Sequence, residues 1–241
     1  MNTPRLRLFA GPNGSGKSTL NNVISKELLG VYINPDDIEK EINKFDFLDM
    51  FNYGIETNEQ DVISFFENHP LLAKANLKNE LCLLKFIDNK IIFSDIPMNS
   101  YYASICADFI RHQLLKLKIS FTFETVMSSK DKVDFLKKAQ EAGYRTYLYF
   151  IATQDPILNI SRVNNRVKLG GHSVPKDKIV SRYYRSLELL SEAVKYSSRA
   201  YIFDNSSQEK LWIAQINNGK EFEFKSEVIP EWVDKYLLRA E

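Results

Sequence analysis

Residues 10–19 read AGPNGSGKST and follow almost directly on a short apolar run, LRLF at 6–9. The stretch matches the pattern G-x-x-x-x-G-K-[ST], with Gly11, Gly16, Lys17 and Ser18 at its fixed positions. Glycines allow backbone torsions closed to other residues, so successive N–H groups can turn inward onto the oxygens of a phosphate chain. We therefore predict a phosphate loop with these nucleotide-binding residues: Gly11, Pro12, Asn13, Gly14, Ser15, Gly16, Lys17, Ser18 and Thr19.

Two side chains of this loop complete the expected chemistry. Lys17 brings a mobile positive charge to the outer phosphates, and the Ser18 hydroxyl is placed to ligate Mg²⁺. A helix is predicted from about Lys17 to Leu29, closed by Gly30, with its positive N-terminal end toward the same phosphates. By chance, a glycine-rich turn would match the four fixed positions of this pattern in about one per cent of chains of this length. The motif alone does not separate a motor, a switch, a transporter subunit and a kinase.

Composition narrows these classes. The chain has 241 residues, enough for one large domain or two small ones, and a formal net charge of +1 from 32 Lys and Arg against 31 Asp and Glu. That balance argues against nucleic acid as a partner. Cys82 and Cys106 lack metal-ligand spacing and are expected to be buried, reduced thiols. No apolar run reaches the length of a membrane span, and the phosphate loop comes too early for a signal peptide, so we expect a cytoplasmic protein that binds ATP.

The rest of the chain alternates apolar runs with stretches of helical period, which predicts an α/β sheet wound by right-handed crossovers. Five parallel strands are expected, at Leu6–Phe9, Val31–Asn34, Ser120–Phe123, Thr146–Ile151 and Ala200–Phe203. Each run ends in polar residues. Because ligands of open parallel sheets bind at the carboxyl ends of strands, these polar ends are expected to surround one crevice.

Acidic residues at two of these strand ends are the main chemical candidates. Asp36 and Asp37 follow the second strand, where a carboxylate would face the outer phosphate. Asp36 is predicted to act as the base that takes a proton from an acceptor hydroxyl, and Asp37 to cap the helix beginning at Ile38. Glu124 closes the third strand and is predicted to hold Mg²⁺ or the acceptor, with a salt bridge to an arginine as the alternative.

A basic segment after the fourth strand resembles a lid. Arg162 and Arg166 fall four residues apart on one helix face, and Gly170 and Gly171 interrupt before a second helix. These arginines are predicted to stabilise the charge of a transferring phosphoryl group, with solvent-exposed helix charges as the alternative. His172 beside the glycines is a weaker candidate.

Two further segments set the expected domain organisation. A long connection between the second and third strands is interpreted as a helical insertion at about 43–98. For residues 91–99, the sequence does not distinguish a strand followed by a turn from a loop. The chain from about 207 to 241 is expected to form a β-hairpin with Asn-Gly in its turn, followed by a helix that covers a sheet edge. We therefore expect one P-loop kinase domain over 1–241, with its lid at about 156–182.

Several motifs in this order resemble the zeta-toxin family of P-loop kinases. They are GPNGSGKSTL, NPDDI, FETVMS, RVNNRVKLGGHSVP with a following RY, and DNS. The resemblance covers most of residues 5–206 outside the insertion. It implies the sheet order 2-3-1-4-5, ATP with Mg²⁺ as donor, and phosphorylation of the 3′-hydroxyl of UDP-N-acetylglucosamine. The resemblance also suggests an antitoxin protein as a partner.

Carried over onto this sequence, the resemblance assigns a role to each matching residue. Lys17 matches the phosphate-loop lysine, Asp36 the base after the second strand, and Glu124 the acid that helps to hold the acceptor. Arg162 and Arg166 match the lid arginines that bind phosphate. The predicted metal-associated residues are Ser18, Asp36 and Glu124.

The sequence therefore favours an ATP- and Mg²⁺-dependent kinase of a small-molecule hydroxyl, with UDP-N-acetylglucosamine as the leading acceptor. One alternative is a kinase for another acceptor, such as a nucleotide, a sugar or an RNA end. The other is an ATP-dependent switch that transfers nothing and grips a protein partner. Acidic strand ends opposite a basic lid favour transfer.

Overall fold

The computed structural model describes residues 3–22, 24–171 and 173–240 of the 241-residue chain. Its internal contacts divide the chain into two units. One unit consists of Met1–Gly30 and Thr122–Glu241, and the other of Val31–Phe121. The phosphate loop and the lid segment both belong to the first unit.

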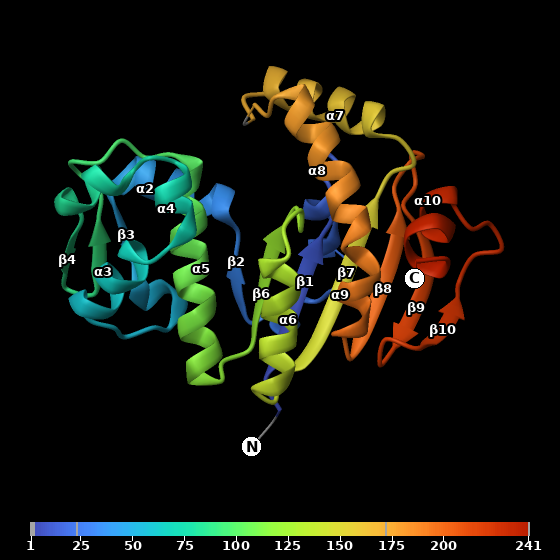
Figure 1. Ribbon diagram of the computed structural model, residues 1–241, viewed down its shortest axis with the longest axis horizontal. Coiled ribbons are helices and arrows are strands. Elements are labelled where there is room, and N and C mark those ends of the chain that lie inside the picture. Colours follow the sequence, from blue (N-terminus) through green and yellow to red (C-terminus); the bar gives the residue numbers. More distant parts are fainter. Residues whose placement is uncertain (1–2, 23, 172, 241) are drawn as a thin grey trace. The chain divides into compact units, whose positions relative to one another are not determined.

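The main sheet has seven strands in the order β10-β9-β8-β7-β1-β6-β2 (Figure 1). Its strands are β1 (Arg5–Ala10), β2 (Val31–Ile33), β6 (Phe121–Thr125), β7 (Arg145–Ala152), β8 (Arg199–Asp204), β9 (Leu211–Asn217) and β10 (Glu221–Phe224). β1 pairs in parallel with β7, and β7 with β8. All five predicted strands are present, and their predicted order corresponds to β2-β6-β1-β7-β8.

The prediction of a five-stranded, all-parallel sheet is wrong in its strand count, because the C-terminal hairpin joins the sheet. β9 pairs antiparallel with β8, and β10 antiparallel with β9. At the hairpin turn Asn218 has φ 53° and Gly219 has φ 69°, the left-handed values that a tight two-residue turn requires. The Asn-Gly hairpin is thus confirmed, and it extends the sheet instead of only covering its edge.

The helices of the first unit follow the strands. They are α1 (Lys26–Leu29), α6 (Asp131–Glu141), α7 (Pro156–Lys168), α8 (Lys176–Glu188), α9 (Leu190–Lys195) and α10 (Glu231–Val233), continued by a π-helical turn, η4 (Asp234–Leu238). Figure 1 shows α6 and α9 on the same face of the strands. On that face Phe123 packs edge-on against Phe135 of α6, and Phe150 lies 6.0 Å from the Trp232 ring of α10. This layer of apolar contacts is the core of the unit.

The segment after the phosphate loop differs from the single α-helix predicted over Lys17–Leu29. A 3₁₀ helix, η1 (Lys17–Asn22), is followed by the short α1. Asn21, Asn22 and Ser25, at the end of η1 and just before α1, have low helix propensity. Gly30 follows α1 with φ 65°, as predicted for a helix end.

The second unit is not purely helical, which corrects the prediction of a helical insertion. Its elements are α2 (Pro35–Phe45), β3 (Phe47–Asp49), η2 (Met50–Tyr53), α3 (Glu59–Glu67), α4 (Pro70–Lys74), η3 (Lys78–Leu83), β4 (Lys85–Ile87), β5 (Lys90–Ile92) and α5 (Ser100–Leu117). The three strands form a small antiparallel sheet in the order β3-β5-β4. Three-residue strands carry too little alternation to be separated from helix by periodicity.

The two cysteines are both free thiols with different environments. Cys106 of α5 is buried, and burial raises the pKa of its thiol. Cys82 of η3 is exposed, so the prediction that both are buried is wrong for this residue. Among the residues that the structure describes, no helix is both long and apolar enough to cross a lipid bilayer.

Candidate phosphate-binding site

The phosphate loop connects β1 to η1 and adopts the conformation that its glycines predict. Gly11, Gly14 and Gly16 have φ of 145°, 75° and 97°, torsions that residues with a Cβ rarely adopt. Within the loop the Ser15 amide donates to the Pro12 carbonyl at 3.2 Å. The chain therefore curls around its own backbone N–H groups, as an anion-binding loop does.

All three glycines are also closely packed. A Cβ would lie 2.0 Å from the Ile151 carbonyl oxygen at Gly11, 2.6 Å from the Asn159 carbonyl oxygen at Gly14, and 2.4 Å from Nδ2 of Asn205 at Gly16. These distances are shorter than any normal carbon contact. Alanine at position 11 or 14 would have to displace backbone, and alanine at position 16 would have to displace the Asn205 side chain that supports the loop.

Two asparagines hold the loop from outside, and sequence reasoning missed both roles. Asn159 of α7 is fully buried and donates from Nδ2 to the Asn13 carbonyl at 2.6 Å. Asn205, which follows β8, donates from Nδ2 to the Ser15 carbonyl at 2.8 Å. Asn205 lies in the DNS motif, so its strand-end position was a usable signal. Asn159 lies inside a helix and carried no such signal.

The support of Asn159 continues into the second lid helix. The Thr153 hydroxyl, at the end of β7, donates to Oδ1 of Asn159, and the Tyr183 hydroxyl of α8 donates to the Thr153 carbonyl at 2.6 Å. All three side chains are buried. Both lid helices are thus connected to the phosphate loop by buried hydrogen bonds.

Lys17 lies over the loop that contains it. Its ammonium group donates to the Gly11 carbonyl at 2.9 Å and to the Pro12 carbonyl at 3.0 Å. These bonds hold the positive charge close to the curled backbone. Ser18, the predicted Mg²⁺ ligand, has an exposed side chain.

The loop also contains polar atoms that its own residues do not satisfy. In the described part of the chain, the buried Ser15 hydroxyl and the buried Asn13 side-chain oxygen have no hydrogen-bond partner. Buried polar atoms without partners are rare and raise the free energy of the folded state. A hydroxyl group and a glycine-rich backbone are groups that bind phosphate oxygens in other proteins, so the loop is a candidate phosphate site.

The lid arginines occupy different environments on α7. Arg162 is half-buried, and its Nη2 lies 3.5 Å from the Ser207 carbonyl after β8. Its buried Nη1 has no hydrogen-bond partner among the described residues. Arg166 is exposed one turn further along. The two share a helix face with Asn159, which contacts the phosphate loop directly.

The glycine pair after α7 forms a hydrogen-bonded helix end. The Gly170 amide donates to the Val167 carbonyl at 3.0 Å, and the Gly171 amide to the Arg166 carbonyl at 2.9 Å. With φ of 86° at Gly170, this is the Schellman arrangement. The neighbouring His172 lies outside the described residues, so its candidate role stays a prediction.

A second cation near the loop was not predicted. Lys210, just before β9, lies with Nζ 3.4 Å from the Thr19 carbonyl and 5.5 Å from the centre of the Phe203 ring. Burial lowers the pKa of this ammonium group. Lys210 is far from the loop in sequence, and only the pairing of β9 with β8 brings it here.

The two predicted acids lie in different units. Glu124 is half-buried near the end of β6, the strand beside β1 in the sheet. Asp36 belongs to the second unit, where it is exposed in the first turn of α2. The predicted cap at Asp37 is wrong, because α2 begins at Pro35 and the Asn34 side chain accepts from the Asp36 amide at 3.0 Å. Asp37 instead pairs with Lys40 at 3.1 Å.

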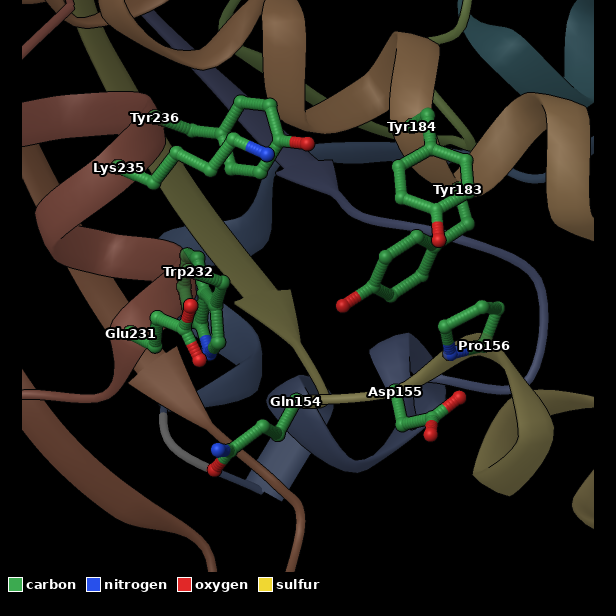
Figure 2. Close-up of a pocket in the computed structure, with 9 residues that line it drawn as sticks. All are labelled: Gln154, Asp155, Pro156, Tyr183, Tyr184, Glu231, Trp232, Lys235 and Tyr236. Atoms are coloured by element: carbon green, nitrogen blue, oxygen red, sulfur yellow. The ribbon is translucent and has the colours of Figure 1, made fainter.

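The segment after β8 also anchors the C-terminal helix. Asp204 accepts from the indole N–H of the buried Trp232 at 2.7 Å and from the Ser206 hydroxyl at 2.9 Å. A cavity of about 230 Å³ lies beside this contact (Figure 2). Its lining residues are Gln154, Asp155, Pro156, Tyr183, Tyr184, Glu231, Trp232, Lys235 and Tyr236. No phosphate-loop residue lines it, so it is separate from the loop.

Comparison with known proteins finds a matching family model, a sequence relative and several solved structures of similar fold. Residues 101–216 match the family model described as Zeta toxin. An uncharacterized protein of Haemophilus influenzae is 32% identical over 72 residues, which is 30% of this chain and 51% of that protein. The chain thus spans about half the length of this curated relative.

Three solved structures share the fold. The AvrRxo1-ORF1:AvrRxo1-ORF2 complex with sulphate ions gives a TM-score of 0.56 at 17% identity, over 97% of this chain and 63% of that one. The complex with ATP gives 0.51 at 16%, over 92% and 61%. The PezAT chromosomal toxin-antitoxin system of Streptococcus pneumoniae gives 0.53 at 15%, over 99% and 80%. This chain therefore spans less than two thirds of either AvrRxo1 chain.

The mostly parallel sheet, with a glycine-rich loop after its central strand, defines a protein with the P-loop kinase type of fold. Residues 101–216, slightly less than half of the chain, match the family model described as Zeta toxin. In this segment the chain is similar to the zeta-toxin family.

Proposed function

We propose that this protein is an ATP- and Mg²⁺-dependent kinase that transfers the γ-phosphoryl group to a hydroxyl. The observation that carries the proposal is the phosphate loop, curled by its positive-φ glycines and held in place by Asn159 and Asn205. A loop held at two points needs no reorganisation to receive phosphate oxygens, and such preorganisation is the main source of catalysis in phosphoryl transfer.

ATP, when bound, supplies the transferable phosphoryl group, and Mg²⁺ neutralises part of its charge. Residues 11–19 hold the phosphates through backbone N–H groups and the Ser15 hydroxyl. Lys17 places its ammonium group on the outer phosphates. Ser18, Asp36 and Glu124 are the residues that would hold Mg²⁺ and its water shell, since hydroxyl and carboxylate oxygens are the ligands that this ion prefers.

Asp36 accepts the proton of the attacking hydroxyl in this proposal. Its support is its position in the first turn of α2, three residues after β2 ends, and its exposed carboxylate, together with the NPDDI motif. Glu124 orients the same hydroxyl. Arg162 and Arg166 then stabilise the charge that spreads over the transferring group. The buried Arg162 Nη1 without a partner supports this role for the first arginine.

The leading acceptor is the 3′-hydroxyl of UDP-N-acetylglucosamine. The match of residues 101–216 to the Zeta toxin family supports this choice. The PezAT neighbour is a chromosomal toxin-antitoxin system, and the AvrRxo1 neighbours are two-component complexes, one of them with ATP. By analogy we propose an antitoxin protein as a partner and the cytoplasm as the location.

Lys17→Ala tests the phosphate loop. Because the lysine neutralises charge on the outer phosphates, we expect turnover to fall by about 10²- to 10³-fold. The measurement is initial rate against ATP concentration, with folding checked by circular dichroism. A folded variant with near-normal turnover would remove the loop from the mechanism.

The acceptor is tested by offering γ-labelled ATP and Mg²⁺ with UDP-N-acetylglucosamine beside a panel of nucleotides, sugars and RNA ends. Asp36→Asn is the control, because it keeps the shape of the side chain and removes the base. We expect label on the sugar nucleotide, reduced in the variant while ATP affinity changes only a few fold. Label on another compound would support the proposed kinase activity and identify a different acceptor. Tight ATP binding without transfer to any acceptor would favour a switch.

A further inference from the structure

The main sheet has a second face, opposite the one that α6 and α9 cover. Side chains alternate along a strand, so the neighbours of the core residues Leu148 and Phe150 point to this face. The side chains that share it across β1, β7, β8 and β9 are unusually basic and aromatic. We define the basic-aromatic face by Arg7, Arg145, Tyr147, Arg199, Tyr201 and Trp212.

The arginines of this face surround one tyrosine. The Arg7 guanidinium carbon lies 5.3 Å from the centre of the Tyr147 ring, and that of Arg145 lies 6.0 Å from it. Arg199 is in register with Tyr147 on the next strand. Arg5 lies directly opposite Arg145. Like charges in such cross-strand positions destabilise a sheet, so this arrangement has a free-energy cost.

No carboxylate of the described residues lies within ion-pair distance of Arg7, Arg145 or Arg199. Arg7 is only 4% exposed, and its Nη1 has no hydrogen-bond partner. Burial lowers the pKa of its guanidinium group. A buried cation that lacks a counter-charge is expensive, and an anion placed on this face would offset part of that cost.

Aromatic side chains continue this face beyond the arginines, toward the carboxyl ends of the strands. Tyr149 and Tyr201 stack with ring centres 4.6 Å apart, and Trp212 continues the row at 6.2 Å from Tyr201. Trp212 is 38% exposed, although tryptophan is usually well buried. Arginine, tyrosine and tryptophan are the residues most enriched where proteins bind one another.

The arginines of this face are remote from the phosphate loop. Arg7 precedes Gly11 by four residues on β1, and at about 3.3 Å per residue this places it about 13 Å from the start of the loop. Arg5 and Arg145 lie further still along the same strands. An anion bound here would therefore not be a phosphate of the nucleotide.

We propose that the basic-aromatic face docks a carboxylate-bearing segment of a partner protein. Charge complementarity selects carboxylates, and two acids on the same sheet argue for a protein over nucleic acid. Glu221 and Glu223 of β10 are in register with Asn217 and Gln215, whose neighbours on β8 are Arg199 and Tyr201. They would repel a continuous phosphate backbone, whereas a protein segment can carry mixed charge.

The direct test uses the full chain without ATP, so its outcome is independent of the proposed kinase activity. The probe is a labelled twelve-residue peptide of alternating glutamate and leucine, and binding is read by fluorescence anisotropy at low and at physiological salt. We expect salt-sensitive binding that Arg145→Glu weakens about tenfold, which corresponds to about 1.4 kcal/mol. Arg145→Gln should give a smaller loss.

The matched control is Lys138→Glu, which makes the same charge change at an exposed position of α6, the helix on the other sheet face. It should bind the peptide like the native chain. Equal weakening in both variants, or no binding by the native chain, would overturn the proposal. Tighter binding of a twelve-nucleotide single-stranded RNA, with the same dependence on Arg145, would overturn it in favour of a nucleic-acid platform.

Trp212 provides a second readout, because it lies on the face while Trp232 is 3% exposed. Peptide binding should shift the tryptophan emission of the native chain and leave that of Trp212→Phe unchanged. A shift that persists in Trp212→Phe would place the peptide elsewhere and contradict the proposal.

Discussion

At the scale of single residues, the phosphate loop is specified by what lies around it as much as by its own motif. The pattern of glycines, lysine and serine was sufficient to predict the glycine-rich loop after β1, and binding of a nucleotide by residues 11–19 stays a prediction. It was not sufficient to predict Asn159 and Asn205, which donate to the loop carbonyls. Their partners are backbone atoms that any stretch of chain presents, so the only signal in the sequence was the strand-end position of Asn205, and there was none for Asn159.

Gly14→Ala separates close packing from backbone torsion. Gly14 and Gly143 have φ of 75° and 82°, but a Cβ on Gly143 would meet nothing within 4 Å, whereas one on Gly14 would meet the Asn159 carbonyl oxygen. Alanine at positive φ destabilises by about 1–2 kcal/mol at either site. We expect Gly14→Ala to lower the free energy of unfolding, measured in urea, more than Gly143→Ala does. We also expect Gly14→Ala to lose ATP binding. Equal losses for the two variants would contradict the close approach.

Asn159→Ala tests the connection between lid and loop. It removes the donor to Asn13 and the acceptor of Thr153, so we expect a loss of about 2 kcal/mol in unfolding free energy. The loop should also bind ATP more weakly. Asn165→Ala, at an exposed position of the same helix, is the control and should change neither quantity. Normal ATP affinity in a folded Asn159→Ala variant would show that the loop keeps its shape unaided.

At the scale of elements, α7 combines a buried anchor with exposed charge. Asn159 fixes its first turns to the phosphate loop, and Gly170 and Gly171 close its end in hydrogen bonds. The sequence predicted two helices broken by glycines, which is what the structure contains. Whether the glycine pair also acts as a hinge stays a prediction.

Arg166→Ala tests the catalytic use of this helix. If the arginine acts on charge that develops during transfer, the variant should lower kcat more than it raises KM for ATP. Its exposed position makes an effect on folding small. Steady-state kinetics with varied ATP distinguish the two constants. A variant whose KM rises while kcat is unchanged would assign Arg166 to binding ATP in its ground state.

At the scale of the whole molecule, the strands of the parallel sheet were predictable and the strands of the second unit were not. The five predicted strands follow from apolar runs, their order was implied by the family resemblance, and all were found. The three-residue strands β3 and β4 left no periodic signal and lay in a segment predicted as helical, and for the segment of β5 the sequence did not distinguish a strand from a loop. The site has a similar limit. The sequence places Asp36 after the second strand, but its position in the chain does not establish how far its carboxylate lies from the phosphate loop.

Buried tyrosines are predicted to make the folded protein less stable at alkaline pH. Burial raises the pKa of Tyr144 from 10.0 to about 12. Between these values the unfolded chain loses the phenolic proton while the folded chain keeps it, so stability present below pH 10 is lost as the pH rises. Urea unfolding between pH 9 and 12 should show this fall, with a shallower slope in Tyr144→Phe. Identical slopes would contradict the assigned pKa.

The central claim is that the phosphate loop serves phosphoryl transfer to a hydroxyl. The most direct measurement is a mass balance with γ-labelled ATP, Mg²⁺ and UDP-N-acetylglucosamine, which compares label on the sugar nucleotide with label released as inorganic phosphate. The account predicts that most of the label leaving ATP is bonded to the acceptor and that Lys17→Ala abolishes this product. ATP that binds tightly and yields only inorganic phosphate, whatever acceptor is present, would contradict it.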